Sequence, residues 1–282
     1  MSKNTKFGAL YIVATPIGNL EDISQRALNI LSQVSLCAVE DTRKSKILMN
    51  EYNLKTKLIS YEKFSEQKKL SFFISLLKQG EDIALISDAG TPLISDPGYL
   101  LVNRSLEEGI KVIPIPGPSS LISAISVSGL PIDNFVFYGF PPRQKNIRKT
   151  FIRNLMMDNK TSVIFESKNR IKGLIQEIES CDSKRDIFLA REMTKLHESF
   201  YRGKPEEVLK QISLQKKSLK GEFVLVIKGV KEQNYQIFLS SEQRRVLEVL
   251  IENMKKNEAL TLASKLFGIK KNTLYKFLLD EK

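Results

Sequence analysis

The sequence predicts an α/β protein with a small helical segment at its C-terminal end, and three patterns carry that prediction. Over residues 9–120, short apolar runs alternate five times with segments of helical periodicity, which is typical of a mostly parallel sheet. A second set of predicted strands and helices follows over residues 135–227. After residue 240 the apolar residues recur only at helical spacing, which indicates three short helices.

The first half contains five predicted strands, at residues 9–14, 35–39, 57–60, 83–86 and 112–113. Asp22 and Gln25 are interpreted as the capping box of a helix over residues 23–31. Asp96 and Pro97 are interpreted as the N-cap and first residue of a later helix. Parallel strands end at the same edge of a sheet, so the polar loops that follow them should form a crevice for a ligand. These loops are residues 15–19, 40–44, 87–95 and 116–120.

The second half contains predicted strands at residues 135–138, 162–165, 187–190 and 223–227. Residues 231–240 read as a linker, and Gly268 should end the second of the three final helices. Those helices resemble a helix-turn-helix bundle, and they either contact nucleic acid or cap the rest of the protein. We expect domains at residues 1–118, 119–232 and 240–282.

Composition excludes several classes of protein. No apolar run approaches the roughly 18 residues that span a membrane, and the polar N-terminus lacks the apolar core of a signal peptide. Cys37 and Cys181 fit no disulfide or zinc framework, and a histidine-rich metal site is excluded because His197 is the only histidine. We therefore expect a cytoplasmic protein with no metal ion and no membrane segment.

The positive charge is regional. Residues 1–140 hold 14 Lys and Arg against 14 Asp and Glu, whereas residues 141–220 hold 19 against 10. A neutral half beside a basic half suggests that the second half faces a polyanion such as nucleic acid. Solvated, lysine-rich helix faces are the alternative.

Familiar fingerprints are missing. The chain has no G-x-G-x-x-G, no G-x-x-x-x-G-K-[ST] and no G-x-S-x-G, so nicotinamide, nucleoside-triphosphate and serine-hydrolase interpretations lose their main support. Small and turn-forming residues in the polar loops would instead let backbone groups approach a ligand closely.

Motifs along nearly the whole chain resemble one known family. They are Leu10-Tyr11-Ile12-Val13-Ala14-Thr15-Pro16-Ile17-Gly18-Asn19-Leu20, Glu40-Asp41-Thr42-Arg43, residues 87–98 (SDAGTPLISDPG), Pro116-Gly117-Pro118-Ser119, Phe165-Glu166-Ser167, residues 190–195 (AREMTK) and Gly221-Glu222-Phe223. This order is similar to that of the tetrapyrrole-methylase (class III methyltransferase) superfamily. Within it, the match is to the ribosomal small subunit methyltransferase I family, the 16S rRNA cytidine 2′-O-methyltransferases.

The resemblance implies two α/β domains with a cleft between them, S-adenosylmethionine as methyl donor, and 16S rRNA in the small ribosomal subunit as substrate. The target would be the ribose of cytidine 1402. It also implies a homodimer, with no role for DNA or a membrane. There are two alternatives. The basic second half disfavours a tetrapyrrole methyltransferase, and the motif-bearing loops disfavour a non-catalytic ribosome-binding factor.

By the same resemblance, residues of both domains would bind the donor. From the first half these are Pro16, Asp88, Gly90, Thr91, Ser119 and Ser120, and from the second they are Phe165, Glu166, Ala190 and Arg191. A carboxylate such as Asp88 can face the cationic end of the donor. Alternatively, Asp88 only shapes its loop through an Asx-turn.

Methylation of a ribose hydroxyl needs a group that accepts its proton. The candidates are Glu40, Asp41 and Glu192, and spacing does not choose among them; residues 40–43 could instead form only a helix cap with an internal ion pair. Relatives usually carry a histidine-containing stretch where this chain has Tyr61-Glu62-Lys63-Phe64-Ser65-Glu66. Either histidine is not the base in this family, or this member has moved that role to Lys63 or Glu66. In both cases the sequence argues against a histidine base.

Candidate RNA contacts are Asn19, Arg43, Arg143, Arg148 and Lys195. Lys145, Lys149 and Arg153 recur at helical spacing with Arg143 and Arg148. Such a basic helix could follow phosphates and make affinity depend on salt.

Overall fold

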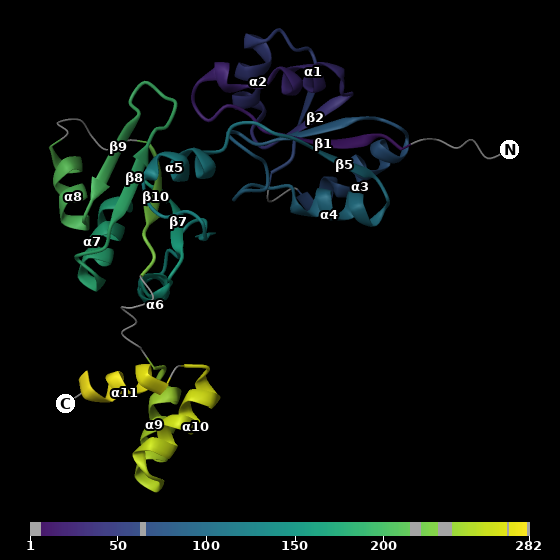
Figure 1. Cartoon of the computed structure of the whole chain (residues 1–282). Helices are drawn as coiled ribbons and strands as arrows, with labels where there is room; N and C mark the ends of the chain where they lie inside the picture. Colours follow the sequence, from purple (N-terminus) through teal and green to yellow (C-terminus); the bar gives the residue numbers. More distant parts are fainter. Residues whose placement is uncertain (1–6, 63–65, 215–220, 231–238, 270, 281–282) are drawn as a thin grey trace. The chain divides into compact units, whose positions relative to one another are not determined.

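The computed structural model describes residues 7–62, 66–214, 221–230, 239–269 and 271–280 (Figure 1). The chain divides into two compact units. One consists of residues 1–156 with 160–228, and the other of residues 157–159 with 229–282. The larger unit contains two five-stranded sheets, and the smaller one contains three helices. In the described residues, no helix is long and apolar enough to cross a membrane.

The first sheet is parallel throughout, as the alternation of strands and helices predicted. Its strands are β1 (Ala9–Val13), β2 (Leu36–Val39), β3 (Lys57–Ser60), β4 (Ile83–Ile86) and β5 (Lys111–Ile115), in the order β3-β2-β4-β1-β5. The short helix η1 (Leu20–Asp22) and helices α1 (Gln25–Gln33), α2 (Thr42–Glu51), α3 (Glu66–Lys78) and α4 (Tyr99–Glu107) connect the strands.

Helices cover both faces of this sheet (Figure 1). On β4, Ala84 and Ile86 belong to the apolar cluster that includes α1 and α2, whereas Ile83 and Leu85 belong to the cluster that includes α3 and α4. Successive side chains of a strand point to opposite faces, so an unbroken apolar run is what a sheet buried on both faces requires. Since helices cover both faces, a ligand could reach this sheet only at the loops beyond the carboxyl ends of its strands.

The second sheet is mainly antiparallel. It consists of β6 (Phe135–Phe137), β7 (Thr161–Ser167), β8 (Ile187–Arg191), β9 (Ser199–Gly203) and β10 (Glu222–Ile227), in the order β6-β7-β10-β8-β9, and only β6 and β7 run parallel. Its helices are α5 (Ser120–Ser128), α6 (Lys145–Met157), α7 (Ile171–Cys181) and α8 (Pro205–Ser213). The edge strand β9 was not predicted, because its five residues, SFYRG, form no apolar run.

Two predicted helix starts were wrong. Helix α1 begins at Gln25, and Ser24 rather than Asp22 caps it by accepting a hydrogen bond from the Ala27 N–H at 3.1 Å. Helix α4 begins at Tyr99 after Gly98, which has φ +131° and makes no side-chain cap, so Asp96 and Pro97 do not start it. The loop before α4 places Leu93 and Ser95 in the left-handed region, which delays the helix and leaves Asp96 inside the loop.

The smaller unit contains the three predicted helices, α9 (Ser241–Asn253), α10 (Lys256–Phe267) and α11 (Lys271–Asp280). Leu247, Leu260, Ala263 and Leu274 form its buried centre. Gly268 ends α10 with φ +67°, as predicted. Most of the predicted linker, residues 231–238, lies outside the described residues.

Candidate active site

Loops after three strands of the first sheet touch one another. Thr15 and Gly90 exchange two backbone hydrogen bonds of 2.9 Å, and the Thr15 hydroxyl donates to the Ser87 carbonyl at 3.2 Å. The Thr91 hydroxyl donates to the Pro118 carbonyl at 3.2 Å. The loops that follow β1, β4 and β5 therefore form one continuous structure at the carboxyl edge of the sheet, where α/β proteins bind ligands.

Backbone strain is concentrated in the loop after β4. Gly90 has φ +82°, and the non-glycine residues Leu93 and Ser95 have φ +73° and +71°. Left-handed conformations of ordinary residues cost of order 1 kcal/mol each and cluster at functional sites. At Gly117, in the loop after β5, an added Cβ would lie 3.1 Å from the Ala14 Cβ. The two glycines therefore let the loops after β4 and β5 pack closely against residues of the loop after β1.

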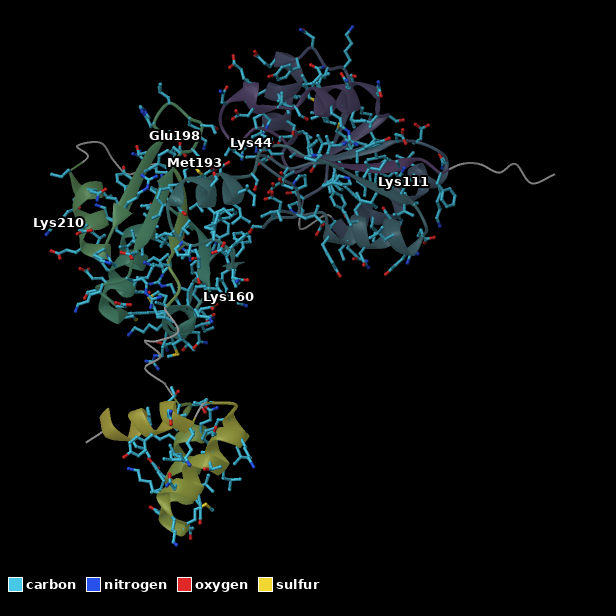
Figure 2. All side chains as sticks on the ribbon, in the orientation of Figure 1. Lys44, Lys111, Lys160, Met193, Glu198 and Lys210 are labelled. Carbon is cyan, nitrogen blue, oxygen red and sulfur yellow. The ribbon has the colours of Figure 1, made fainter. Side chains whose placement is uncertain are left out.

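The loop after β1 also joins the second sheet. Ile17 is 8% exposed and belongs to an apolar cluster with Ala124, Val163 and Met193; Met193 is labelled in Figure 2. The Asn19 N–H donates to the Thr194 hydroxyl at 3.1 Å. This loop is consequently held between the strand ends of the first sheet and the loop after β8.

Three acidic side chains gather beside the loop after β4. Asp88 accepts a hydrogen bond from the Asp41 N–H at 3.0 Å and pairs with the Lys44 ammonium at 2.6 Å; Lys44 is labelled on α2 in Figure 2. Burial, and then the charge of Asp88, raises the pKa of Glu40. Burial, and then the charge of Glu40, raises the pKa of Asp96 to about 6. Carboxylates with raised pKa values in a ligand crevice are suited to proton transfer near neutral pH.

The three predicted proton acceptors differ in their surroundings. Asp41 caps α2, and its hydrogen bonds with Arg43 hold its pKa at about 2. At Glu192, burial alone would raise the pKa, but hydrogen bonds from the Glu222 N–H and the Lys195 ammonium outweigh it and lower the pKa. Among these three, Glu40 is therefore the carboxylate that is prepared to hold a proton.

Comparison with known proteins assigns the family. The model of the tetrapyrrole (corrin/porphyrin) methylases matches residues 9–209. The chain is 40% identical over 271 residues to ribosomal RNA small subunit methyltransferase I of Haemophilus influenzae, with 96% of each chain covered. It is 46% identical over 222 residues to the Thermotoga maritima protein of that name, with 79% of this chain and 99% of the relative covered. The chain belongs to this methyltransferase family.

Solved structures agree on the fold. Uroporphyrin-III-C-methyltransferase from Thermus thermophilus superposes with a TM-score of 0.56 at 18% identity, covering 78% of this chain and 94% of that chain. A diphthine synthase superposes with a TM-score of 0.58 at 13% identity, covering 79% and 90%. Family membership makes S-adenosylmethionine the methyl donor. The acidic side chains and close-approaching backbone of the strand-end loops fit a cationic ligand of this kind.

The second sheet contributes the methyltransferase's other predicted donor residues, and they differ in accessibility. Ala190 is fully buried, so only its backbone could reach a ligand, and Arg191 is 6% exposed. The Phe165 ring packs edge-on against Phe137, with centroids 4.7 Å apart. Glu166 pairs with Arg170 at 2.8 Å, and its buried Oε2 atom has no hydrogen-bond partner among the described residues.

The predicted RNA contacts also fall into two groups. Asn19 and Arg143 are exposed. Arg43 pairs with Asp41, Arg148 pairs with Glu177, and Lys195 pairs with both Glu192 and Glu222. Arg148 is also largely enclosed, its side chain being 17% exposed, so it supports α6 against α7 more than it presents a charge to solvent.

Asp96, whose carboxylate lies near Glu40 and Asp88, was not among the residues that the sequence suggested for the site. Its signal was a second acid in the stretch already chosen for Asp88, but the Asp-Pro pair suggested a helix cap instead. Lys63 lies outside the described residues, whereas Glu66 accepts a hydrogen bond from the Gly98 N–H at 2.6 Å. His197 is exposed in the loop between β8 and β9. In the described residues, no group of three or more His, Cys, Asp or Glu could hold a metal ion.

Proposed function

We propose that this methyltransferase transfers the methyl group of S-adenosylmethionine to the 2′-hydroxyl of a cytidine ribose in 16S rRNA of the small ribosomal subunit. One observation carries the proposal: relatives named for that subunit's RNA are 38–41% identical over 95–100% of this chain. Cytidine 1402, a cytoplasmic location and a homodimeric state belong to the proposal through the family resemblance.

The donor would bind where the loops after β1, β4 and β5 meet. We assign Pro16, Asp88, Gly90 and Thr91 to this site, together with the start of α5 at Ser119 and Ser120. Phe165, Glu166, Ala190 and Arg191 are assigned to its side on the second sheet. The donor supplies an electrophilic methyl group on a sulfonium centre. The protein supplies orientation, which can account for much of the rate enhancement of a transfer between two bound groups.

Glu40 is the proposed proton acceptor. Burial and the neighbouring charge of Asp88 raise its pKa, which makes it a better base than an ordinary carboxylate. Asp41 and Glu192 hold their charges in hydrogen bonds that lower their pKa values, so we assign them structural roles. Asp96 would support Glu40, since two neighbouring carboxylates favour a proton remaining on one of them.

The basic face of α6 is proposed to bind rRNA phosphates. Lys145, Lys149 and Arg153 follow one another at four-residue spacing, and all three are exposed. Residues four apart lie on the same side of a helix, so they form one stripe, with Arg143 just before the helix. Arg148 is turned to Glu177 instead. Asn19 and Lys195 would contact RNA at the junction of the loops after β1 and β8.

A tetrapyrrole substrate and a purely structural role on the ribosome are the alternatives. The uroporphyrin methyltransferase shares the fold, but at 18% identity it carries no argument about substrate. We further propose the domain division at residues 1–118, 119–232 and 240–282, in which each sheet, with its helices, forms one domain.

The decisive test incubates the protein with labelled S-adenosylmethionine and small subunits that lack the methyl group. Label should appear in 16S rRNA, and nuclease digestion should release it as 2′-O-methylcytidine. An unlabelled rRNA would refute the proposal, and donor binding without transfer would favour the structural alternative.

Glu40→Gln tests the proton acceptor. Turnover should fall by about 100-fold or more, while donor affinity stays within about twofold. Glu51→Gln is the matched control because Glu51 is an exposed residue at the end of the neighbouring helix α2, and it should change neither quantity. Full turnover of the Glu40 variant would remove Glu40 from this role.

A further inference from the structure

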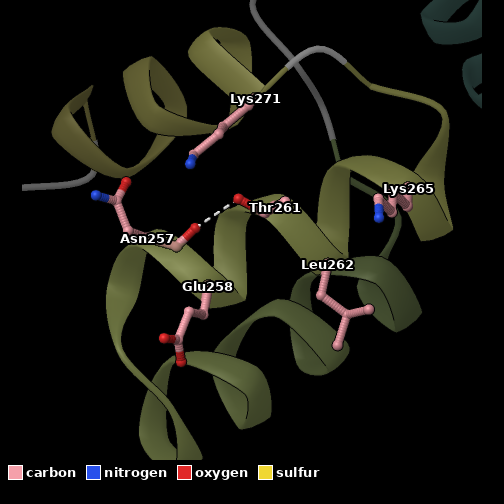
Figure 3. Close-up of a pocket in the computed structure, with 6 residues that line it drawn as sticks. All are labelled: Asn257, Glu258, Thr261, Leu262, Lys265 and Lys271. Carbon is pink, nitrogen blue, oxygen red and sulfur yellow. Dashed lines mark hydrogen bonds between the residues drawn. The ribbon is translucent and has the colours of Figure 1, made fainter.

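The helices α10 and α11 present a polar surface that the methyl-transfer site does not use. We define the α10–α11 face by Lys256, Asn257, Thr261 and Lys265 of α10 and by Lys271 and Tyr275 of α11. Lys265 and Lys271 line one open hollow with Asn257, Glu258, Thr261 and Leu262 (Figure 3). The Lys256 ammonium lies 5.1 Å from the centre of the Tyr275 ring.

The opposite sides of the same helices form the centre of the bundle. Ala259, Leu260 and Ala263 of α10 are fully buried, and so is Leu274 of α11. The main apolar residues of the two helices are thus buried without any contribution from the α10–α11 face. Two helices joined by a short glycine-containing turn, with one side packed and the other polar, have the form of a helix-turn-helix.

Charge is distributed unevenly over this bundle. Residues 255–280, which include α10 and α11, hold six lysines and two acids, Glu258 and Asp280, whereas residues 241–253 of α9 hold three acids and two arginines. Cations are therefore gathered on one helix pair. Such a concentration is the electrostatic pattern of a surface that binds phosphates.

The hollow has the chemistry that a phosphate backbone requires. Figure 3 shows Lys271 directed from the start of α11 toward the α10 residues Asn257 and Thr261. Ammonium groups and a side-chain amide can donate hydrogen bonds to phosphate oxygens. The Thr261 hydroxyl donates to the Asn257 carbonyl at 2.7 Å, so toward RNA its oxygen can only accept a hydrogen bond, such as one from a ribose hydroxyl. The exposed ring of Tyr275 (46% exposed) adds a surface for a sugar or base. Glu258 opposes these contacts and limits the net charge at the hollow.

The methyltransferase fold is complete without this bundle. The family model ends at residue 209, and 99% of the Thermotoga maritima relative is covered by an alignment that leaves about a fifth of this chain unmatched. The uroporphyrin methyltransferase likewise is 94% covered by 78% of this chain. A segment that the catalytic fold does not need, and that carries a face with net positive charge, is suited to substrate binding.

We propose that the α10–α11 face binds the phosphate backbone of a double-helical RNA segment. This inference rests on the proposed function, because it makes the bundle a second contact with the same RNA. The major groove of an RNA helix is too deep and narrow for side chains to read, so α11 would bind phosphates and 2′-hydroxyls rather than base edges. Binding is accordingly independent of sequence, steep in salt, and stronger for RNA than for DNA.

The test measures binding of the full chain to a fluorescent RNA hairpin, without methyl donor, over a series of salt concentrations. Lys271→Gln should weaken binding roughly threefold to fivefold, and Lys265→Gln with Lys271→Gln should lower the salt slope by about 2. Arg245→Gln is the matched control, since Arg245 is exposed on α9 and its loss removes the same charge from the same unit. The control should bind like the unaltered protein.

Two results would overturn the inference. One is that the double variant and the control bind RNA with equal affinity and salt slope; the other is that a DNA duplex of the same sequence binds as tightly as the RNA. Circular dichroism melting of each variant shows whether the bundle remains folded. If the double glutamine variant does not fold, the double alanine variant, Lys265→Ala with Lys271→Ala, is measured in its place.

Methylation is measured separately on small subunits. The double variant should raise KM and leave kcat and donor affinity unchanged. If rRNA receives no methyl group but the hairpin still distinguishes the variants, the proposed function fails and the RNA-binding face stands.

Discussion

Asp96→Asn should stabilise the protein at neutral pH, because the charged form of this carboxylate is less favourable in the native state than in the unfolded chain. Burial and the charge of Glu40 raise the pKa of Asp96 from 3.8 to about 6. Between those values the native state binds more protons than the unfolded state, so stability falls as pH rises through this window. The cost is complete above about pH 6 and absent below about pH 3.8.

The magnitude follows from the shift. A shift from 3.8 to about 6 corresponds to about 3 kcal/mol at 1.36 kcal/mol per unit. Asp96 is only partly enclosed, and solvent screening reduces the figure to about 1–2 kcal/mol. Asparagine has nearly the same shape and no charge, so the variant should gain that amount at pH 8. For a folded unit of this size, the gain raises the melting temperature by a few degrees.

The assay is thermal and urea unfolding of both proteins from pH 5 to 8. The advantage of the variant should grow as pH rises. Asp186→Asn is the control of opposite sign, because hydrogen bonds from Lys204 and Lys228 lower the pKa of Asp186; its loss should destabilise the protein at pH 8. An Asp96 variant that is no more stable than the unaltered protein at pH 8, or whose gain is the same at pH 5, would refute this reasoning.

Substitutions at Ile17, Gly90 and Glu192, with two control substitutions, test the residues that hold the loops of the candidate site together. Ile17→Ala should lower the free energy of unfolding by about 2–4 kcal/mol in urea and weaken donor binding, whereas Ile17→Val should cost about 1 kcal/mol. Gly90→Ala should cost about 1–2 kcal/mol because its φ is +82°; Gly173→Ala, in a helix with open space around it, should gain about 0.5–1 kcal/mol. Glu192→Gln should cost about 1 kcal/mol at pH 7 with turnover nearly unchanged, and the cost should shrink as pH falls below the ordinary pKa of 4.5, because the native pKa of Glu192 lies below that value and the stabilisation is lost as this carboxylate is protonated. A large loss of turnover in this variant would restore Glu192 as a proton acceptor.

Local pattern was sufficient to predict much of the fold. Apolar runs such as Ile83–Ile86 predicted the buried strands, and Gly268 marked the end of α10. Periodicity and glycine conformation are properties of neighbouring residues, so they can be read from the chain. The motifs at the strand ends likewise indicated the family, which the comparisons confirmed, and predicted that these loops meet at the edge of a parallel sheet.

Only the tertiary structure distinguished the surroundings of the charged residues. Glu40, Asp41 and Glu192 were equal candidates by spacing, yet burial and partners raise the pKa of one and lower the other two. Asp88 accepts its hydrogen bond from a residue 47 positions away, and Asn19 donates to one 175 positions away. Burial and charge pairing depend on residues brought together by folding, which no local pattern records. For the same reason, Asp96 was first interpreted as a helix cap, and only the structure showed its enclosure near Glu40.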